Sequence, residues 1–204
     1  VVLAARGQNR GKTTASLGLT DAIVGRGMKA GFIKPVGQRY QVVEGTRADE
    51  DAVLMKAVFD LPDGLDDMSP VTLPRHFTTD YIMGRVGEDL ETEVTDAATR
   101  VAAGKDLLLI EGTGHAGVGA VVGLSNARVA ALLEAPVAIV SEGGVGRPID
   151  EIVLNHALFE RHGVRVLGAL VNKVDVDSHP PLPEVLRRGL AQHKTDLLGF
   201  IPVS

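Results

Sequence analysis

The chain has 204 residues, of which 45% are hydrophobic and 3% aromatic, and its formal net charge is -5. This length suits one domain with an aliphatic core, which is typical of a parallel sheet flanked by helices. The acidic balance disfavours a nucleic-acid surface, and the absence of cysteine excludes disulfides, thiolate metal sites and cysteine nucleophiles.

Neither a membrane span nor a signal peptide is predicted from the sequence. No apolar run reaches about 18 residues, and the apolar residues 1–5 lead directly into a glycine-rich turn. A cysteine-free chain also fits a reducing compartment, so we expect a soluble, cytoplasmic protein.

Six apolar runs bounded by turn residues predict strands. They cover residues 1–5, 30–34, 107–111, 137–141, 166–172 and 199–202. Helical spacing of apolar residues predicts helices between most of them. These cover residues 12–26, 49–60, 81–103, 126–133, 148–162 and 183–193. Residues 61–79 are expected to form a long surface connection. The alternation predicts one α/β domain over residues 1–204, with a doubly wound, mostly parallel sheet.

A glycine-rich segment joins the first predicted strand to the first predicted helix. Its residues are Gly7, Gln8, Asn9, Arg10, Gly11, Lys12, Thr13 and Thr14. Backbone N–H groups of such a loop converge on phosphate oxygens, and the helix N-terminus adds a partial positive charge. Lys12 would then reach the β and γ phosphates, and the Thr13 hydroxyl would bind Mg²⁺. The segment predicts a P-loop for a nucleoside triphosphate.

Two features leave this interpretation with alternatives. The full phosphate-loop pattern has glycine where this chain has Arg6, so the match is to Gly11-Lys12-Thr13. The alternative to a P-loop is a glycine-rich turn before a solvated lysine, which is compatible with the same sequence. Arg6 or Arg10 would add a second positive charge near the phosphates, or would be solvated.

Two acidic segments are candidates to complete a magnesium site. Mg²⁺ prefers oxygen ligands, so a P-loop hydroxyl needs one or two carboxylates beside it. Glu111 ends a buried strand and precedes a glycine-rich turn, which places its carboxylate at the edge of the sheet that holds the P-loop. Asp51 belongs to the run Asp49-Glu50-Asp51, which equally suits the first turn of a helix for dipole reasons alone.

Two further residues lie in loops that follow predicted strands. Lys34 follows the second strand and would lie at the same edge as the P-loop, where it could neutralise a transferring phosphoryl group or a carboxylate substrate. The alternative is a solvated lysine before a proline turn. His115 follows the glycine-rich turn after Glu111 and is a candidate proton carrier, although a lone histidine in a loop more often has no catalytic role.

The run Asn172-Lys173-Val174-Asp175 follows the fifth predicted strand and is a candidate site for the nucleotide base. The Asn172 amide can hydrogen-bond a purine edge. Asp175 could accept hydrogen bonds from guanine, a pattern that would favour GTP over ATP. A simple turn after a strand is the alternative.

Four motifs follow one another along the chain: Gly11-Lys12-Thr13, Lys34-Pro35-Val36, Asp51-Ala52-Val53-Leu54 and Glu111-Gly112-Thr113-Gly114. Their order resembles that of the dethiobiotin synthetase superfamily, which includes cobyrinic acid a,c-diamide synthase domains and the N-terminal domain of long phosphate acetyltransferases. The resemblance covers nearly the whole chain. Residues 49–52 and 69–71 look most like the phosphate acetyltransferase type of domain.

The resemblance implies a role for each matching residue. Lys12 and Thr13 would bind phosphate and Mg²⁺, and Asp51 and Glu111 would complete the metal site. Lys34 would contact the γ-phosphate or a substrate carboxylate. Asn172 would contact the base.

The acceptor site of dethiobiotin synthetases is not reproduced. Those enzymes continue Lys-Pro-Val with Gln-Thr-Gly, whereas Gly37-Gln38-Arg39 follows here. Their Glu-Gly-Ala-Gly-Gly is replaced by Glu111-Gly112-Thr113-Gly114-His115. The sequence therefore does not predict dethiobiotin synthesis.

The leading functional hypothesis is binding of ATP and Mg²⁺ with phosphoryl transfer to a small carboxylate or carbamate. Lys12 and Lys34 are the expected catalytic residues, acting by positioning and charge neutralisation. A regulatory domain that senses nucleotide and hydrolyses it slowly or not at all is the second hypothesis, and a GTPase-like switch is the third. The resemblance also implies a homodimer.

Overall fold

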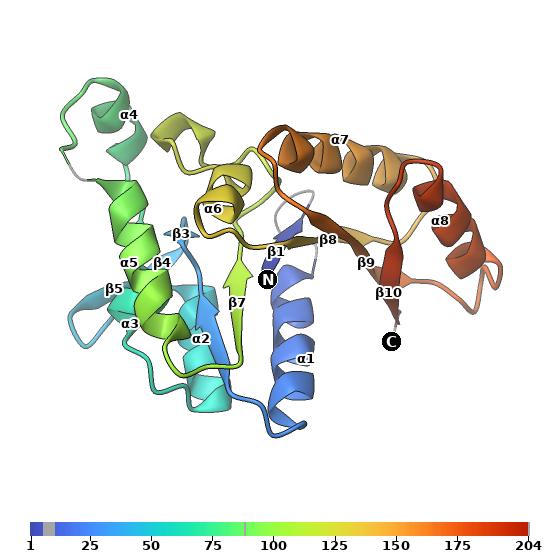
Figure 1. Ribbon diagram of the computed structural model, residues 1–204, viewed down its shortest axis with the longest axis horizontal. Helices are drawn as coiled ribbons and strands as arrows, with labels where there is room; N and C mark the ends of the chain where they lie inside the picture. The colour runs from blue at the N-terminus through green and yellow to red at the C-terminus, as the bar shows by residue number, and fades with distance from the viewer. Residues whose placement is uncertain (6–10, 88, 204) are drawn as a thin grey trace.

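The computed structural model describes residues 1–5, 11–87 and 89–203 (Figure 1). The strands are β1 (Val2–Ala5), β2 (Ala30–Ile33), β3 (Val36–Gly37), β4 (Tyr40–Val43), β5 (Thr46–Asp49), β6 (Val71–Thr72), β7 (Leu107–Glu111), β8 (Val137–Glu142), β9 (Val166–Val174) and β10 (Leu197–Pro202). The helices are α1 (Lys12–Val24), α2 (Glu50–Phe59), α3 (Leu65–Met68), α4 (Phe77–Ile82), α5 (Leu90–Ala102), η1 (Ala120–Val122), α6 (Asn126–Leu132), α7 (Arg147–Arg161) and α8 (Leu182–Ala191). No helix in the described ranges is long and apolar enough to cross a membrane.

The main sheet has six strands in the order β10-β9-β8-β1-β7-β2, and every neighbouring pair is parallel. The six strands predicted from apolar runs are the six strands of this sheet, so the predicted α/β class with a mostly parallel sheet is confirmed. The chain first fills the β7–β2 side of β1 and then the β8–β10 side. The order therefore reverses at β1, and ligands of such sheets bind at this switch point, outside the carboxyl ends of the strands.

Helices cover both faces of the sheet (Figure 1). Alternate residues of β1 show this directly, because Val2 and Ala4 belong to one buried cluster while Leu3 and Ala5 belong to another. The first cluster includes side chains of α5, α6 and α7, and the second includes side chains of α1 and α2. A strand covered on both faces is apolar along its whole length, which is why the sequence showed runs rather than alternation.

Four short strands lie outside the main sheet and were not predicted. β3 pairs with β6 in parallel, and β4 and β5 form an antiparallel hairpin. β6 and α3 lie within residues 61–79, so the long surface connection expected there contains a short helix and a short strand. These strands have two to four residues, and β4 is partly exposed. Strands this short and exposed leave no apolar run to detect.

The helix predicted over residues 81–103 is wrong, because the chain forms two helices there. α4 ends at Ile82, and α5 begins at Leu90. Gly84 adopts a φ of 69°, which an α-helix excludes. Asp89 then caps α5, since its side chain accepts a hydrogen bond from the Thr92 backbone N–H.

Candidate functional site

A pocket at the carboxyl ends of β1, β2 and β7 gathers six of the predicted site residues. It is lined by Gly11, Lys12, Thr13, Lys34, Gln38, Arg39, Asp49, Glu50, Asp51, Glu111, Thr113 and Gly114. Its walls come from four separate segments of sequence, which the parallel sheet brings to one edge.

Gly11 and Lys12 form the start of α1 beside this pocket. Gly11 has a φ of 89°, in the left-handed region that favours glycine. Lys12 is only 7% exposed, and burial together with the nearby Lys34 ammonium lowers the pKa of Lys12 to about 8. Lys12 therefore remains mostly protonated at pH 7. The predicted phosphate-binding residues Gly7, Gln8, Asn9 and Arg10, and Arg6 before them, lie outside the described residues.

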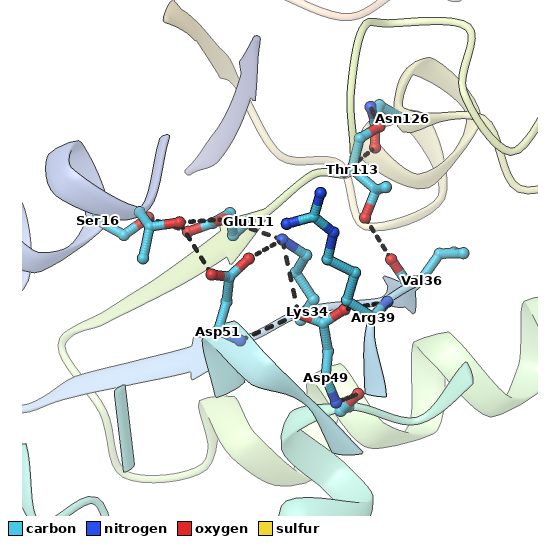
Figure 2. Close-up of polar contacts among 11 residues, drawn as sticks. Ser16, Lys34, Val36, Arg39, Asp49, Asp51, Glu111, Thr113 and Asn126 are labelled. Carbon is cyan, nitrogen blue, oxygen red and sulfur yellow. Dashed lines mark hydrogen bonds and ion pairs between the residues drawn. The ribbon is translucent and has the colours of Figure 1, made fainter. Parts of the chain in front are cut away.

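Lys34 lies at the centre of a buried network of acidic and hydroxyl groups (Figure 2). Its Nζ donates to Asp51 Oδ2 at 2.5 Å and to Glu111 Oε1 at 2.9 Å. Thr13 Oγ1 donates to Asp51 Oδ1 at 2.9 Å and lies 3.5 Å from Glu111 Oε1. Ser16, one helical turn after Thr13, donates from Oγ to Glu111 Oε2 at 2.5 Å. Both carboxylates thus face the start of α1.

Asp49 is a further member of the network that the sequence did not single out. It is 3% exposed, and its Oδ1 lies 4.0 Å from Lys34 Nζ. Asp49 caps α2 by accepting from the Asp51 backbone N–H, and its own N–H donates to Ser69 Oγ. This cap fixes the first turn of α2, which carries Asp51 toward Lys34.

Burial and pairing oppose each other in the pKa values of this network. Burial raises the pKa of Glu111 above its usual value despite the Lys34 ammonium beside it. For Asp51, burial is outweighed by the charge and hydrogen bond of Lys34, so the pKa is lowered. For Lys34, burial is outweighed by Glu111, Asp51 and Asp49, which raise its pKa. The network therefore holds Lys34 as a cation.

The oxygen atoms around Thr13 fit a small, hard cation. Thr13 Oγ1 lies within 3.5 Å of a carboxylate oxygen of Asp51 and of one of Glu111. A hydroxyl with one or two carboxylates is the donor set that Mg²⁺ takes in nucleotide sites, where waters and phosphates complete its shell. Among the described residues, no group of three or more His, Asp or Glu side chains could hold a metal ion.

The loop after β7 is held by hydrogen bonds from Asn126, which was not identified from the sequence. Asn126 accepts from the Thr113 N–H and donates to the Thr113 and His115 carbonyls. Thr113 Oγ1 donates to the Val36 carbonyl at 2.5 Å, which ties this loop to β3. A Cβ on Gly112 would lie 2.7 Å from the Asn126 side chain, so this position requires glycine.

His115, the candidate proton carrier, is exposed and does not line the pocket, and its Nδ1 accepts a hydrogen bond from the Gly117 N–H.

The candidate base-binding residues lie beside the pocket rather than in its lining. Asn172 is buried against Gly11, where a Cβ would be 1.9 Å from Asn172 Nδ2. Lys173 pairs with Glu142 at 3.0 Å. Asp175 is exposed, and its carboxylate accepts from the Ser178 N–H, a bond that lowers its pKa. Asn172 thus contacts the phosphate-loop side of the site through Gly11.

A family model described as an AAA domain matches residues 1–204. The phosphate acetyltransferase of Nitrosomonas europaea is 28% identical over 203 residues, which cover 94% of this chain and 28% of that protein. The phosphate acetyltransferase of Pseudomonas aeruginosa is 32% identical over 179 residues, which cover 84% of this chain and 24% of that protein. The ATP-dependent dethiobiotin synthetase BioD of Xanthomonas oryzae pv. oryzae is 26% identical over 166 residues, which cover 81% of this chain and 74% of that protein.

Solved structures show the same fold at low sequence identity. The MinC:MinD cell division protein complex of Aquifex aeolicus matches with a TM-score of 0.58 and 14% identity, covering 100% of this chain and 81% of that chain. The BceF tyrosine kinase domain matches with a TM-score of 0.53 and 15% identity, covering 84% of this chain and 67% of that chain.

Proposed function

Since the chain belongs to the dethiobiotin synthetase-like AAA domain family, we propose that it binds ATP with Mg²⁺ and transfers the γ-phosphoryl group to a small carboxylate or carbamate. The observation that carries this proposal is the pocket in which Lys12, Lys34, Thr13, Asp51 and Glu111 meet. Two cations and a set of oxygen donors in one pocket are the parts that phosphoryl transfer requires.

Each residue has a role that follows from its place. Lys12, at the mouth of α1, would contact the β and γ phosphates together with the helix N-terminus. Lys34, held charged by three carboxylates, would lie where it can neutralise the transferring group or the acceptor carboxylate. Thr13, Asp51 and Glu111 would hold Mg²⁺, which supplies positive charge to the phosphates when bound.

The proposed reaction balances without a covalent enzyme intermediate. An oxygen of the acceptor attacks the γ-phosphorus of ATP, the bond to the β-phosphate oxygen breaks, and ADP leaves. The product is an acyl or carbamoyl phosphate, which a nucleophile then attacks with release of phosphate. Positioning and charge neutralisation by Lys12 and Lys34 would supply most of the rate enhancement.

A second candidate is a domain that binds nucleotide for regulation. The chain spans 28% and 24% of the length of the two phosphate acetyltransferases, so in those proteins the matching region accompanies a much larger remainder. The GTPase-like switch that Asn172 to Asp175 suggested has less support, because the Asp175 carboxylate already accepts from Ser178. The homodimer implied by the resemblance stays a prediction.

Phosphate release measured with and without acceptors tests the proposed function. With Mg·ATP and a panel of small carboxylates, amines and bicarbonate, we expect phosphate or ADP to appear only when an acceptor is present. Steady release from Mg·GTP without any acceptor would instead support a switch. Tight nucleotide binding without turnover under every condition would support a regulatory domain and would contradict the proposed transfer.

A further inference from the structure

The rim of the pocket carries a cation outside the Lys34 network. Arg39 lies two residues beyond β3 and lines the same pocket as Lys34 and Thr113. Figure 2 shows its side chain extending past Lys34 on the side of Thr113. Arg39 is exposed, whereas Lys34 is 4% exposed at the pocket floor. The pocket therefore has one cation at its floor and another at its rim.

The backbone of Arg39 is hydrogen-bonded through both its N–H and its carbonyl. Its N–H donates to Asp49 Oδ2 at 3.4 Å, and its carbonyl accepts from the Glu50 N–H at 2.9 Å. Both contacts join it to the start of α2, the same turn that presents Asp51 to Lys34. The base of the Arg39 side chain is therefore held in register with the Lys34 network.

Three of the four carboxylates that line the pocket are engaged with groups other than the Arg39 guanidinium. Asp51 and Glu111 bond to Lys34, and Asp49 accepts from backbone N–H groups. The fourth is that of Glu50, which is exposed and whose hydrogen bond to Arg39 comes from its backbone N–H. No ion pair or hydrogen bond joins the Arg39 guanidinium to any residue that the structure describes. A guanidinium that faces a pocket without a carboxylate partner is suited to an anionic ligand, which it can hold by two parallel hydrogen bonds.

From these observations, and resting on the proposed function, we propose that Arg39 selects an acceptor with a second anionic group besides the carboxylate that receives the phosphoryl group. The reacting carboxylate lies at the floor beside Lys34, and the second carboxylate or phosphate lies at the rim against Arg39. Arg39 is a specificity residue in this scheme and does not contact the transferring group.

Binding of matched pairs of probes tests this proposal. The protein is saturated with Mg²⁺ and a non-hydrolysable ATP analogue, and calorimetry then measures the affinities of succinate and butyrate, glutarate and valerate, and 3-phosphonopropionate. We expect each dicarboxylate to bind at least about tenfold more tightly than the monocarboxylate of equal length, as a charge-assisted hydrogen bond implies. Tighter binding of 3-phosphonopropionate than of succinate would identify the second anion as a phosphate-type group.

Two variants separate the role of Arg39 from a general effect of charge. Arg39→Gln should reduce dicarboxylate affinity about tenfold and leave monocarboxylate and nucleotide affinities unchanged. Arg47→Gln is the matched control, because it also removes one arginine charge. Arg47 lies in β5, is exposed over the Tyr40 ring and does not line the pocket. The Arg47→Gln variant should change none of these affinities.

The contrary outcomes are distinct from a failure of the proposed function. If the nucleotide binds but dianions bind no better than monoanions, or if no probe binds, the inference about Arg39 is overturned. If Arg39→Gln weakens nucleotide binding as much as dicarboxylate binding, Arg39 serves the nucleotide and the inference is again overturned. If the unmodified protein does not bind the nucleotide, the proposed function itself fails.

Discussion

Replacing Lys34 with alanine is expected to lower the free energy of unfolding by about 3–5 kcal/mol at pH 7, because it leaves buried carboxylates without the cation that is hydrogen-bonded to them. Lys34 bonds to Asp51 and to Glu111, and Glu111 is fully buried. Without the Lys34 ammonium, the Glu111 carboxylate keeps only the neutral hydroxyl groups of Ser16 and Thr13 as hydrogen-bond partners. Urea denaturation followed by circular dichroism measures the change.

The loss should depend on pH in a direction that the pKa values determine. In Lys34→Ala, the burial that already raises the pKa of Glu111 is no longer opposed by the ammonium. The folded variant then binds more protons than the unfolded chain between the two pKa values, so its stability falls as the pH rises. We expect a smaller loss at pH 5 than at pH 8.

Two controls identify the source of this effect. Lys105→Ala breaks the ion pair between Lys105 and Asp63, whose side chains are 11% and 13% exposed respectively. This variant should lose less free energy of unfolding than Lys34→Ala. Lys34→Ala should also cost less in a Glu111→Gln background, where no carboxylate is left at that position. An equal loss at both pH values and in both backgrounds would show that Lys34 does not compensate the charge of Glu111.

Gly11→Ala should weaken Mg·ATP binding by about tenfold or more, from backbone strain and a collision together. Gly11 has a φ of 89°, where a side chain costs about 1–2 kcal/mol. The added Cβ would also lie 1.9 Å from Asn172 Nδ2 and 2.9 Å from its Cγ. Asn172 is buried, and its Oδ1 accepts from the Lys173 N–H, so turning the side chain away loses that bond. Isothermal titration calorimetry measures the affinity.

Gly27→Ala is the matched control for this prediction. Gly27 has a φ of 77°, but no atom lies within 4 Å of the Cβ that would be added. The control should therefore lose stability through strain and keep the nucleotide affinity of the unmodified protein. If Gly11→Ala and Gly27→Ala bind Mg·ATP equally well, the contact between Gly11 and Asn172 does not matter for the site.

The main sheet was predictable because parallel strands covered on both faces are continuous apolar runs. The β4–β5 hairpin was not, because Tyr40–Val43 is partly exposed and its pairing with Thr46–Asp49 involves polar side chains. The break between α4 and α5 depends on Gly84 and the Asp89 cap, which are local signals inside a stretch of helical spacing. Local turn chemistry overrode the longer pattern there.

The candidate site was predictable where strand ends point to one edge, which is why Lys34 and Glu111 could be expected beside Lys12. Asp49 was not separable from Glu50 and Asp51, because acidic residues are common in any first helical turn. Ser16 gave no signal, since a hydroxyl inside a helix has no sequence pattern of its own. The support of the Thr113 loop by Asn126 joins residues 13 apart and depends on tertiary packing.

The central claim is that Lys12 and the start of α1 bind the phosphates of a nucleoside triphosphate. Calorimetric titration at pH 7, where Lys12 is mostly protonated, tests it by comparing Mg·ATP and Mg·GTP binding to the unmodified protein, Lys12→Ala and Lys29→Ala. Lys29 is exposed and precedes β2, at the opposite edge of the sheet from the pocket. We predict that Lys12→Ala loses measurable triphosphate binding while Lys29→Ala keeps it. Unchanged affinity in Lys12→Ala would contradict the account.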